Sequence, residues 1–222
     1  MRHEYKHRLN YMDYTVLASR IRSVLPRDRH ATDAGEYNVR SLYFDTPDNR
    51  ALREKISGTD RREKFRIRRY PGGMERIALE KKIKIGGLCN KKSEILSTAE
   101  CQRIIAGDID WIGNDDRQLL LEFYSKLRGQ LLHPKVIVEY IREPFIFPAG
   151  NVRITFDRDI RTGLHRADFL DDSVPLIPAG DEIILLEVKY DEYIPSFITD
   201  LLQIGSRRAA ACSKYAIARS YG

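Results

Sequence analysis

Polar and apolar residues alternate along much of this chain, and the alternation predicts β-strands. In residues 62–70, Lys64, Arg66 and Arg68 occupy every second position, with Phe65 and Ile67 between them. Successive side chains of a strand point to opposite faces, so this strand has one charged face and one apolar face. The same pattern predicts strands at residues 2–8, 37–45, 75–85, 88–95, 136–142, 152–157 and 182–190. Charged faces recur in six of the predicted strands.

Turn and helix signals separate these strands. Pro71-Gly72-Gly73 predicts a hairpin turn, and residues 144–150 predict a turn before the strand at 152–157. Helices are predicted at residues 46–58, 97–106, 114–132 with Leu131 on the apolar side, from Pro195 onward, and at 206–221. Strands with helices in their connections predict an α+β fold, and a closed sheet is one arrangement that it allows.

The first predicted helix follows the first strand. Asn10 or Asp13 can cap it, and Pro26 follows its end. Its apolar stripe consists of Tyr14, Leu17, Ile21, Val24 and Leu25. Arg20 and Arg22 fall on the polar side of this helix, where we expect them to contribute little to function.

Composition narrows the class of protein. The chain has 222 residues, of which 42% are hydrophobic and 32% are charged, as expected for one soluble globular domain spanning residues 1–222. No apolar run approaches the roughly 20 residues that cross a bilayer, and the N-terminus is charged, so a cytoplasmic location is expected. Three cysteines, far apart in the chain, give no support for a disulfide framework or a zinc site.

The positive charge is concentrated in one stretch. Lys and Arg number 38 against 32 Asp and Glu, but residues 61–92 alone hold twelve basic and three acidic residues. This distribution indicates a surface that faces a polyanion. Glu4, Glu80 and Glu187 share strand faces with the cations, and carboxylates among Arg and Lys indicate phosphate bound together with a divalent metal. Neither a P-loop nor a Rossmann fingerprint is present.

Eight short motifs, in their order along the chain, carry a resemblance to a known family. They are Glu4-Tyr5-Lys6, Ser41-Leu42-Tyr43-Phe44-Asp45-Thr46, Arg66-Ile67-Arg68, Leu79-Glu80-Lys81-Lys82, Val138-Glu139-Tyr140-Ile141-Arg142, Arg153-Ile154-Thr155-Phe156-Asp157, Leu186-Glu187-Val188-Lys189 and Ser213-Lys214-Tyr215. In this order they resemble the catalytic domain of the vacuolar transporter chaperone (VTC) polyphosphate polymerases, within the triphosphate tunnel metalloenzymes. The resemblance covers nearly the whole chain.

The resemblance implies an eight-stranded antiparallel β tunnel with flanking helices, in which ATP places its triphosphate and a polyphosphate chain threads through. Phosphate-binding residues would be Lys6, Arg66, Arg68, Lys82, Arg142, Arg153 and Lys214, with Tyr140 and Ser213 as hydroxyl donors. Glu187 would hold Mn²⁺ or Mg²⁺, with Glu4 and Glu80 as further candidate ligands and Lys189 and Lys91 in support. The partners would be ATP and inorganic polyphosphate.

The chain departs from the family pattern at two places. Tunnel enzymes begin with Glu-x-Glu-x-Lys, but the first Glu position here is Arg2, which favours phosphoryl transfer over hydrolysis. A further basic residue is expected where Ala209, Ala210 and Ala211 stand, and Arg207 or Arg208 is a candidate replacement. Eukaryotic members also carry a phosphate-sensing domain and membrane helices, so coupling to transport would need a separate membrane or regulatory partner.

Three functions remain open at this stage. The first is a polymerase that moves the γ-phosphoryl group of ATP onto polyphosphate. The second is a tripolyphosphatase or nucleoside triphosphatase on the same fold. The third is a non-catalytic module that binds polyphosphate or RNA, for which a pI of about 9.2 is the general signal. A nucleic-acid partner is disfavoured because it leaves Glu80 and Glu187 unexplained.

Overall fold

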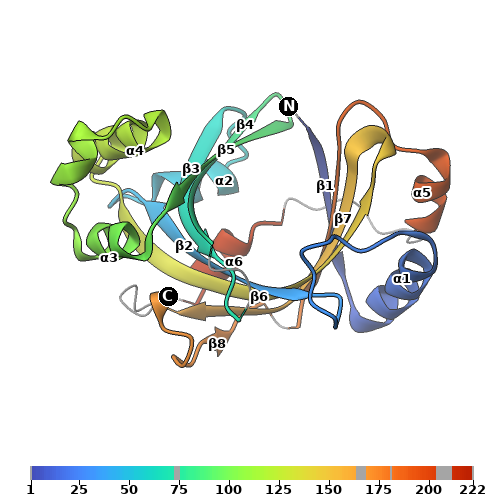
Figure 1. Cartoon of the computed structure of the whole chain (residues 1–222). Coiled ribbons are helices and arrows are strands. Elements are labelled where there is room, and N and C mark those ends of the chain that lie inside the picture. The colour runs from blue at the N-terminus through green and yellow to red at the C-terminus, as the bar shows by residue number, and fades with distance from the viewer. Residues whose placement is uncertain (1, 73–75, 164–168, 181, 204–211, 222) are drawn as a thin grey trace.

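A curved antiparallel sheet forms the body of the protein (Figure 1). The computed structural model describes residues 2–72, 76–163, 169–180, 182–203 and 212–221. Its strands are β1 (His3–Leu9), β2 (Tyr37–Asp45), β3 (Arg62–Arg69), β4 (Ile77–Ile85), β5 (Leu88–Leu96), β6 (His133–Phe147), β7 (Val152–Gly163), β8 (Ile177–Pro178) and β9 (Ile184–Tyr190). Its helices are α1 (Tyr11–Val24), α2 (Arg50–Ile56), α3 (Thr98–Ala106), α4 (Gln118–Gly129), α5 (Ser196–Leu201) and α6 (Lys214–Arg219), with short 3₁₀ helices η1 (Asp110–Asn114) and η2 (Ala149–Asn151).

The strand order turns the sheet into a tunnel. The order is β1-β9-β7-β6-β2-β3-β4-β5, and β8 pairs with β7 outside this path. One isolated bridge joins the two ends of the order, where the backbones of Arg2 and Cys89 exchange hydrogen bonds of 3.0 and 3.1 Å. The predicted eight-stranded antiparallel tunnel with flanking helices is therefore confirmed, with β8 as a short ninth strand.

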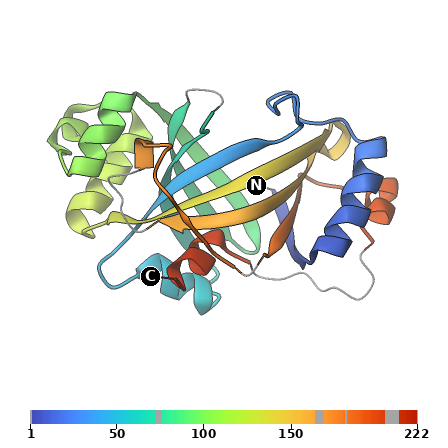
Figure 2. The ribbon, with the colours of Figure 1, turned by 90° about the horizontal axis from the view of Figure 1, so that it is seen from below.

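Helices cover the outer face of the sheet on opposite sides of the tunnel (Figures 1 and 2). On one side Phe65 and Leu79 of the sheet share a buried cluster with Phe123 of α4. On the other side Leu17 of α1 and Phe156 of β7 belong to a second cluster. The apolar faces of the strands are thus buried outward under helices, and the charged faces are left to point into the tunnel.

Two predicted boundaries were wrong for local reasons. The segment 144–150 is not a turn, because β6 continues through Pro144 to Phe147. Pairing of β2 with β6 stops at Arg142, so Pro144 faces no β2 partner, and its carbonyl accepts a hydrogen bond from the Asp28 amide at 3.1 Å. A proline lacks the donor that a central strand needs but is tolerated at such a position.

The helix predicted at 114–132 is shorter and interrupted. It divides into η1 and α4, because the Asp115 carboxylate accepts the Arg117 amide at 2.8 Å and competes with helical hydrogen bonds. Leu131 lies beyond α4 with a φ of 52° and is exposed, so its predicted apolar contact is also wrong. Only the part of the last predicted helix that forms α6 lies among the described residues.

Arg22 is not the idle surface residue that the helical pattern predicted. Its Nε and Nη2 donate to the two carboxylate oxygens of Glu143 at 2.7 and 2.9 Å. The Glu143 side chain is only 2% exposed, so this contact fastens α1 to β6. Val24, predicted on the apolar stripe of α1, is exposed, whereas Asn10 caps the helix as expected. Within the described ranges we find no helix with the length and apolar character needed to span a bilayer.

Candidate functional site

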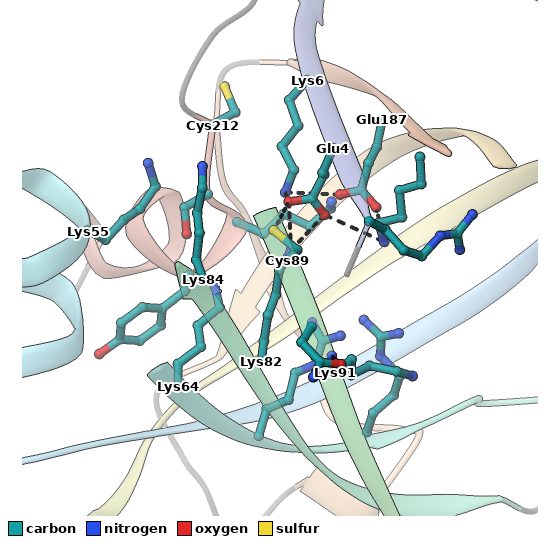
Figure 3. A pocket seen from close by; sticks show the side chains of 18 of the residues that line it. Glu4, Lys6, Lys55, Lys64, Lys82, Lys84, Cys89, Lys91, Glu187 and Cys212 are labelled. Atoms are coloured by element: carbon teal, nitrogen blue, oxygen red, sulfur yellow. Dashed lines mark hydrogen bonds and ion pairs between the residues drawn. The ribbon is translucent and has the colours of Figure 1, made fainter. Parts of the chain in front are cut away.

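A cavity of about 700 Å³ occupies the inside of the tunnel (Figure 3). Side chains from β1, β2, β3, β4, β5, β6, β7 and β9 line it, together with residues of α2 and α6. The described part of its wall holds fourteen Lys and Arg side chains and three Glu side chains. This excess of positive charge in one enclosed space is the principal electrostatic feature of the molecule.

Two glutamates and three lysines form one cluster in the cavity (Figure 3). Lys6 Nζ lies 2.9 Å from Glu187 and 3.7 Å from Glu4, while Lys82 Nζ donates to both Glu4 oxygens at 2.6 and 2.7 Å. Lys189 Nζ lies 2.5 Å from Glu187 and 3.6 Å from Glu4. Burial alone would raise the pKa of Glu4, but the neighbouring lysines outweigh it and lower that pKa to about 2. Both carboxylates are therefore charged at neutral pH.

A second carboxylate, Glu80 of β4, orients cations from three strands. Its oxygens accept from Arg66 Nη2 at 2.6 Å and from Lys91 Nζ at 2.7 Å. Arg68 Nε lies 3.7 Å from Glu80, and Arg68 Nη2 donates to the Tyr140 hydroxyl at 3.2 Å. Burial would raise the pKa of Glu80, yet these cations hold it well below its usual range. Glu80 thus fixes the two arginines of the Arg66-Ile67-Arg68 motif against the wall.

Asp157 of β7 plays the same part for the opposite wall. Both of its oxygens accept from Arg142, from Nε at 2.6 Å and from Nη2 at 2.7 Å. Lys214 also donates to Asp157, and its ammonium group lies 4.5 Å from the centre of the Tyr140 ring. Asp157 is fully buried, and the two cations outweigh its burial and lower its pKa to about 2. A bidentate contact of this kind fixes the guanidinium plane.

Arg153 is held from outside the tunnel strands. Its Nη2 lies 2.9 Å from the carboxylate of Asp28, in the loop after α1, and donates to the Tyr37 hydroxyl at 2.9 Å. Asp28 is itself fixed, because its amide donates to Pro144 and its carboxylate accepts the His30 amide at 3.0 Å. The loop after α1 therefore positions a cation of the cavity.

The motif 41–46 docks α2 and α6 on the tunnel. Asp45 is fully buried and accepts the backbone amides of Ala51 and Leu52, in the first turn of α2, at 2.8 and 3.1 Å. Its other donor is the Tyr215 hydroxyl of α6, at 2.5 Å. The Tyr215 ring stacks on Tyr43 with ring centres 5.2 Å apart. These contacts place Lys214, the residue before Tyr215, at the cavity wall.

The residues singled out from the sequence meet in this one cavity, although their roles stay predictions. Those that line it are Glu4, Lys6, Arg66, Arg68, Lys82, Lys91, Tyr140, Arg142, Arg153, Glu187, Lys189, Ser213 and Lys214. Glu80 lies just behind the wall under Arg66. Ser213 is also the N-cap of α6, where its Oγ accepts the Ala216 amide at 3.4 Å. Arg207, Arg208 and Ala209–Ala211 fall outside the described residues.

Sequence reasoning missed several members of the wall. Lys64 and Lys84 stand on the charged faces that the alternation predicted, but they belong to none of the family motifs. Tyr43 belongs to a motif, yet its strand gave no sign that its ring would be surrounded by cations. Burial would raise its pKa, but Arg66, Lys64 and Arg68 outweigh that effect and lower it to about 7. Lys55 of α2 could not be found, because the docking of α2 depends on tertiary contacts.

Whether the site can hold a divalent metal depends on its oxygen donors. No group of three or more His, Cys, Asp or Glu side chains arranged for a metal occurs among the described residues. Glu4 and Glu187 are nevertheless adjacent, since Lys6 and Lys189 each contact both of them. Mg²⁺ is commonly bound by one or two carboxylates plus substrate phosphates. The pair therefore fits a divalent ion whose remaining ligands are phosphate oxygens and water.

Comparison with protein families identifies the chain as a whole. The model of the VTC domain matches residues 1–221. The chain belongs to the VTC domain family. Comparison with curated protein sequences gives no match.

Solved structures that resemble this VTC domain share its fold at low sequence identity. A putative adenylyl cyclase from Hippeastrum, described as having a dominant triphosphatase activity, is 14% identical with a TM-score of 0.60, over 100% of this chain and 96% of that one. The PH1819 protein of Pyrococcus horikoshii OT3 is 13% identical with a TM-score of 0.54, over all of both chains. A putative adenylate cyclase from Bacillus halodurans is 13% identical with a TM-score of 0.51, over 91% and 87% of the two chains. At these identities the similarity shows a common fold.

Proposed function

We propose that this VTC domain is a metal-dependent polyphosphate polymerase, which transfers the γ-phosphoryl group of ATP to a growing chain of inorganic polyphosphate. The observation that carries the proposal is the cavity wall, with its fourteen cations and three glutamates in one enclosed space. Such a wall is electrostatically costly when empty, because like charges repel more strongly away from bulk water. A bound chain of phosphates would remove that cost.

Unused hydrogen-bond donors support an anionic ligand. Arg68 Nε and Arg153 Nε are buried and have no hydrogen-bond partner in the described structure. Buried donors of charged groups are rarely left unpaired, so each indicates a missing acceptor. Arginine presents a planar set of donors that matches phosphate oxygens, whereas lysine acts as a point charge. The wall offers both kinds of contact.

The reaction needs positioning and charge stabilisation more than a protein nucleophile. A terminal phosphate oxygen of the acceptor chain would form a bond to the γ-phosphorus of ATP, while the bond from that phosphorus to the bridging oxygen breaks and ADP leaves. Arg66, Arg68 and Arg142 are fixed by Glu80 and Asp157, so they would meet the transferring phosphoryl oxygens without reorganising.

Glu187 and Glu4 would hold the divalent ion in this proposal. Bound Mn²⁺ or Mg²⁺ would supply positive charge that neutralises the transferring phosphoryl group. The three lysines that contact these carboxylates would turn toward phosphate oxygens once an ion shared the carboxylates. Lys6 and Lys189 would then contribute to substrate binding as well.

A tripolyphosphatase is the second candidate. The Hippeastrum neighbour, with its described triphosphatase activity, favours it, although that protein shares only the fold with this chain. Against it stands Arg2, which occupies the position of the first glutamate in the tunnel-enzyme pattern and lies 2.8 Å from Asp191. A site with one carboxylate fewer is less suited to binding a metal ion that activates water.

The test is incubation of the protein with ATP and Mn²⁺, followed by a gel that separates long-chain polyphosphate and by assays for ADP and orthophosphate. The polymerase predicts long chains with ADP formed in proportion. Orthophosphate without chain growth would select the triphosphatase, and binding of polyphosphate without turnover would select a binding module. Arg20→Ala is a matched control, because Arg20 lies on α1 outside the cavity and should leave turnover unchanged.

A further inference from the structure

The cations of the cavity wall fall into two groups that differ in their counter-charges. Each cation of the first group lies within 4 Å of a carboxylate; these are Arg2, Lys6, Arg66, Arg68, Lys82, Lys91, Arg142, Arg153, Lys189 and Lys214. Lys64 and Lys84 have no such carboxylate among the described residues. In Figure 3 they lie beside Lys55, away from Glu4 and Glu187. One end of the cavity is therefore basic without compensation.

Strand register adds to the repulsion at this end. On the tunnel-facing side of the β3–β4 pair, Arg62 stands opposite Lys84 and Lys64 stands opposite Lys82. The next pair along is Arg66 with Glu80, which has opposite charges. Like charges directly opposite each other destabilise a sheet. Two successive rows of this kind imply that something other than sheet stability selects the cations.

The charge of Lys64 responds to these surroundings. Burial, together with the positive charges of Lys82 and Lys6, lowers the pKa of Lys64 to about 7, although Tyr43 opposes the shift. Lys55, on α2, has a lowered pKa from burial and from Arg62, Lys6 and Lys84, so it senses the same group of cations. The nearby Glu63 does not compensate them, because its carboxylate binds Lys81 and Lys126 at 2.6 Å.

The chemistry of this end suits a linear chain of phosphates better than a nucleotide base. Residues two apart on a strand are about 7 Å apart, so Arg62, Lys64, Lys82 and Lys84 form a two-by-two array along the strands. Tyr43 offers no open platform for a base, since its ring stacks on Tyr215 and is contacted by Lys64 and Arg66. The array therefore matches a repeating anion.

We propose that Arg62, Lys64 and Lys84, with Lys55 of α2, form a distal polyphosphate subsite through which the growing chain leaves the tunnel. This subsite would take the phosphates beyond the three held among the carboxylate-paired cations. The end with Glu4 and Glu187 would then admit the nucleotide. The inference rests on the proposed function and assigns a direction to the chain.

The test compares two ligands of different length. The double variant Lys64→Ala/Lys84→Ala is titrated with tripolyphosphate and with long-chain polyphosphate by calorimetry, at fixed ionic strength and without metal. Because only the longer ligand reaches the subsite, its affinity should fall on the order of tenfold more than that of tripolyphosphate. The melting temperature should not fall, since the variant removes two members of like-charge pairs.

Lys92→Ala is the matched control. Lys92 is an exposed lysine of β5 that does not line the cavity, so its loss changes the net charge by the same step without touching the subsite. An equal loss of affinity for both ligands, or a loss no greater per charge than in Lys92→Ala, would overturn the inference. If wild-type protein shows the length preference but never extends chains from ATP, the proposed function fails while the subsite stands. If it extends chains but the double variant keeps the length preference, the subsite alone fails.

Discussion

Buried carboxylates prepare individual arginines of this tunnel for work on phosphate. Arg142 would be free to rotate in an empty cavity, but Asp157 binds its Nε and Nη2 and fixes the guanidinium plane. The carboxylate also offsets part of the cost of burying the charge. Glu80 does the same for Arg66, and Asp28 for Arg153. These carboxylates therefore act on the cavity through the cations that they hold.

Replacing Arg66, Arg68 or Arg142 with Ala should slow turnover by about 2 to 4 kcal/mol, roughly 30- to 1000-fold, as removal of a preorganised electrostatic stabiliser does. Arg→Lys should be poorly tolerated at the same positions, because the planar set of donors is lost while the charge stays. Steady-state rates measure both effects. Arg20→Ala is the control, and Arg22 is unsuitable because it binds buried Glu143. Small and equal losses at all positions would favour simple polyanion binding.

Glu187→Gln tests the metal assignment. The substitution keeps the shape of the side chain but removes a charge that Lys6 and Lys189 contact at 2.9 and 2.5 Å. Metal-dependent turnover should be abolished, while ATP still binds, because a negative charge has left a phosphate site. Binding of a labelled ATP analogue and turnover with Mn²⁺ are measured in parallel. Full activity of the variant would remove Glu187 from the mechanism.

At the scale of elements, α6 is placed by a small number of contacts with α2 and β2. Tyr215→Phe removes the hydroxyl that donates to buried Asp45 at 2.5 Å and keeps the ring on Tyr43. We expect a loss of about 1 to 3 kcal/mol in the free energy of unfolding, because Asp45 loses a donor in a buried site. Turnover should also fall, since Lys214 precedes Tyr215 at the wall. Denaturant unfolding and kinetics check the two effects, and a stability equal to wild-type would contradict the first.

Period-two patterning explains why so much of the tunnel could be predicted from the sequence. Lys64, Arg66 and Arg68 are separated by apolar residues that a helix-covered sheet must bury, so their common face follows from local order. Asp157 and Asp28 could not be assigned to Arg142 and Arg153, because those pairings depend on register between strands and on a loop. Pro144 was misread for the same reason: whether β2 pairs with that part of β6 is a tertiary fact.

At the scale of the whole molecule, the empty tunnel should become more stable as the pH rises from about 7 to 9. Tyr43 and Lys64 have pKa values near 7 in the folded protein, and Lys82 has one of about 8, whereas all three lose protons near pH 10 when unfolded. The unfolded chain then binds more protons across this window, so the free energy of unfolding increases with pH. Thermal melts without anions should show a rise of about 5 °C.

Polyphosphate should reverse this trend. A bound polyanion favours protonated Lys64 and Lys82, so the stabilisation that it confers should shrink as the pH rises through the same window. The comparison uses melts with and without saturating polyphosphate at each pH. A melting temperature of the empty protein that falls between pH 7 and 9 would contradict the assignment of these groups.

The seam between β1 and β5 has a mechanical consequence. In the described structure the Arg2–Cys89 bridge is the sole backbone pairing across it, so the tunnel resembles a tube slit along its length. A slit tube resists twisting far less than a seamless one with the same wall. Hydrogen–deuterium exchange should therefore be faster for amides of β1 and β5 than for those of β6 and β7, which have strand neighbours on both sides. Uniform protection around the wall would show instead that the seam is as stiff as the rest.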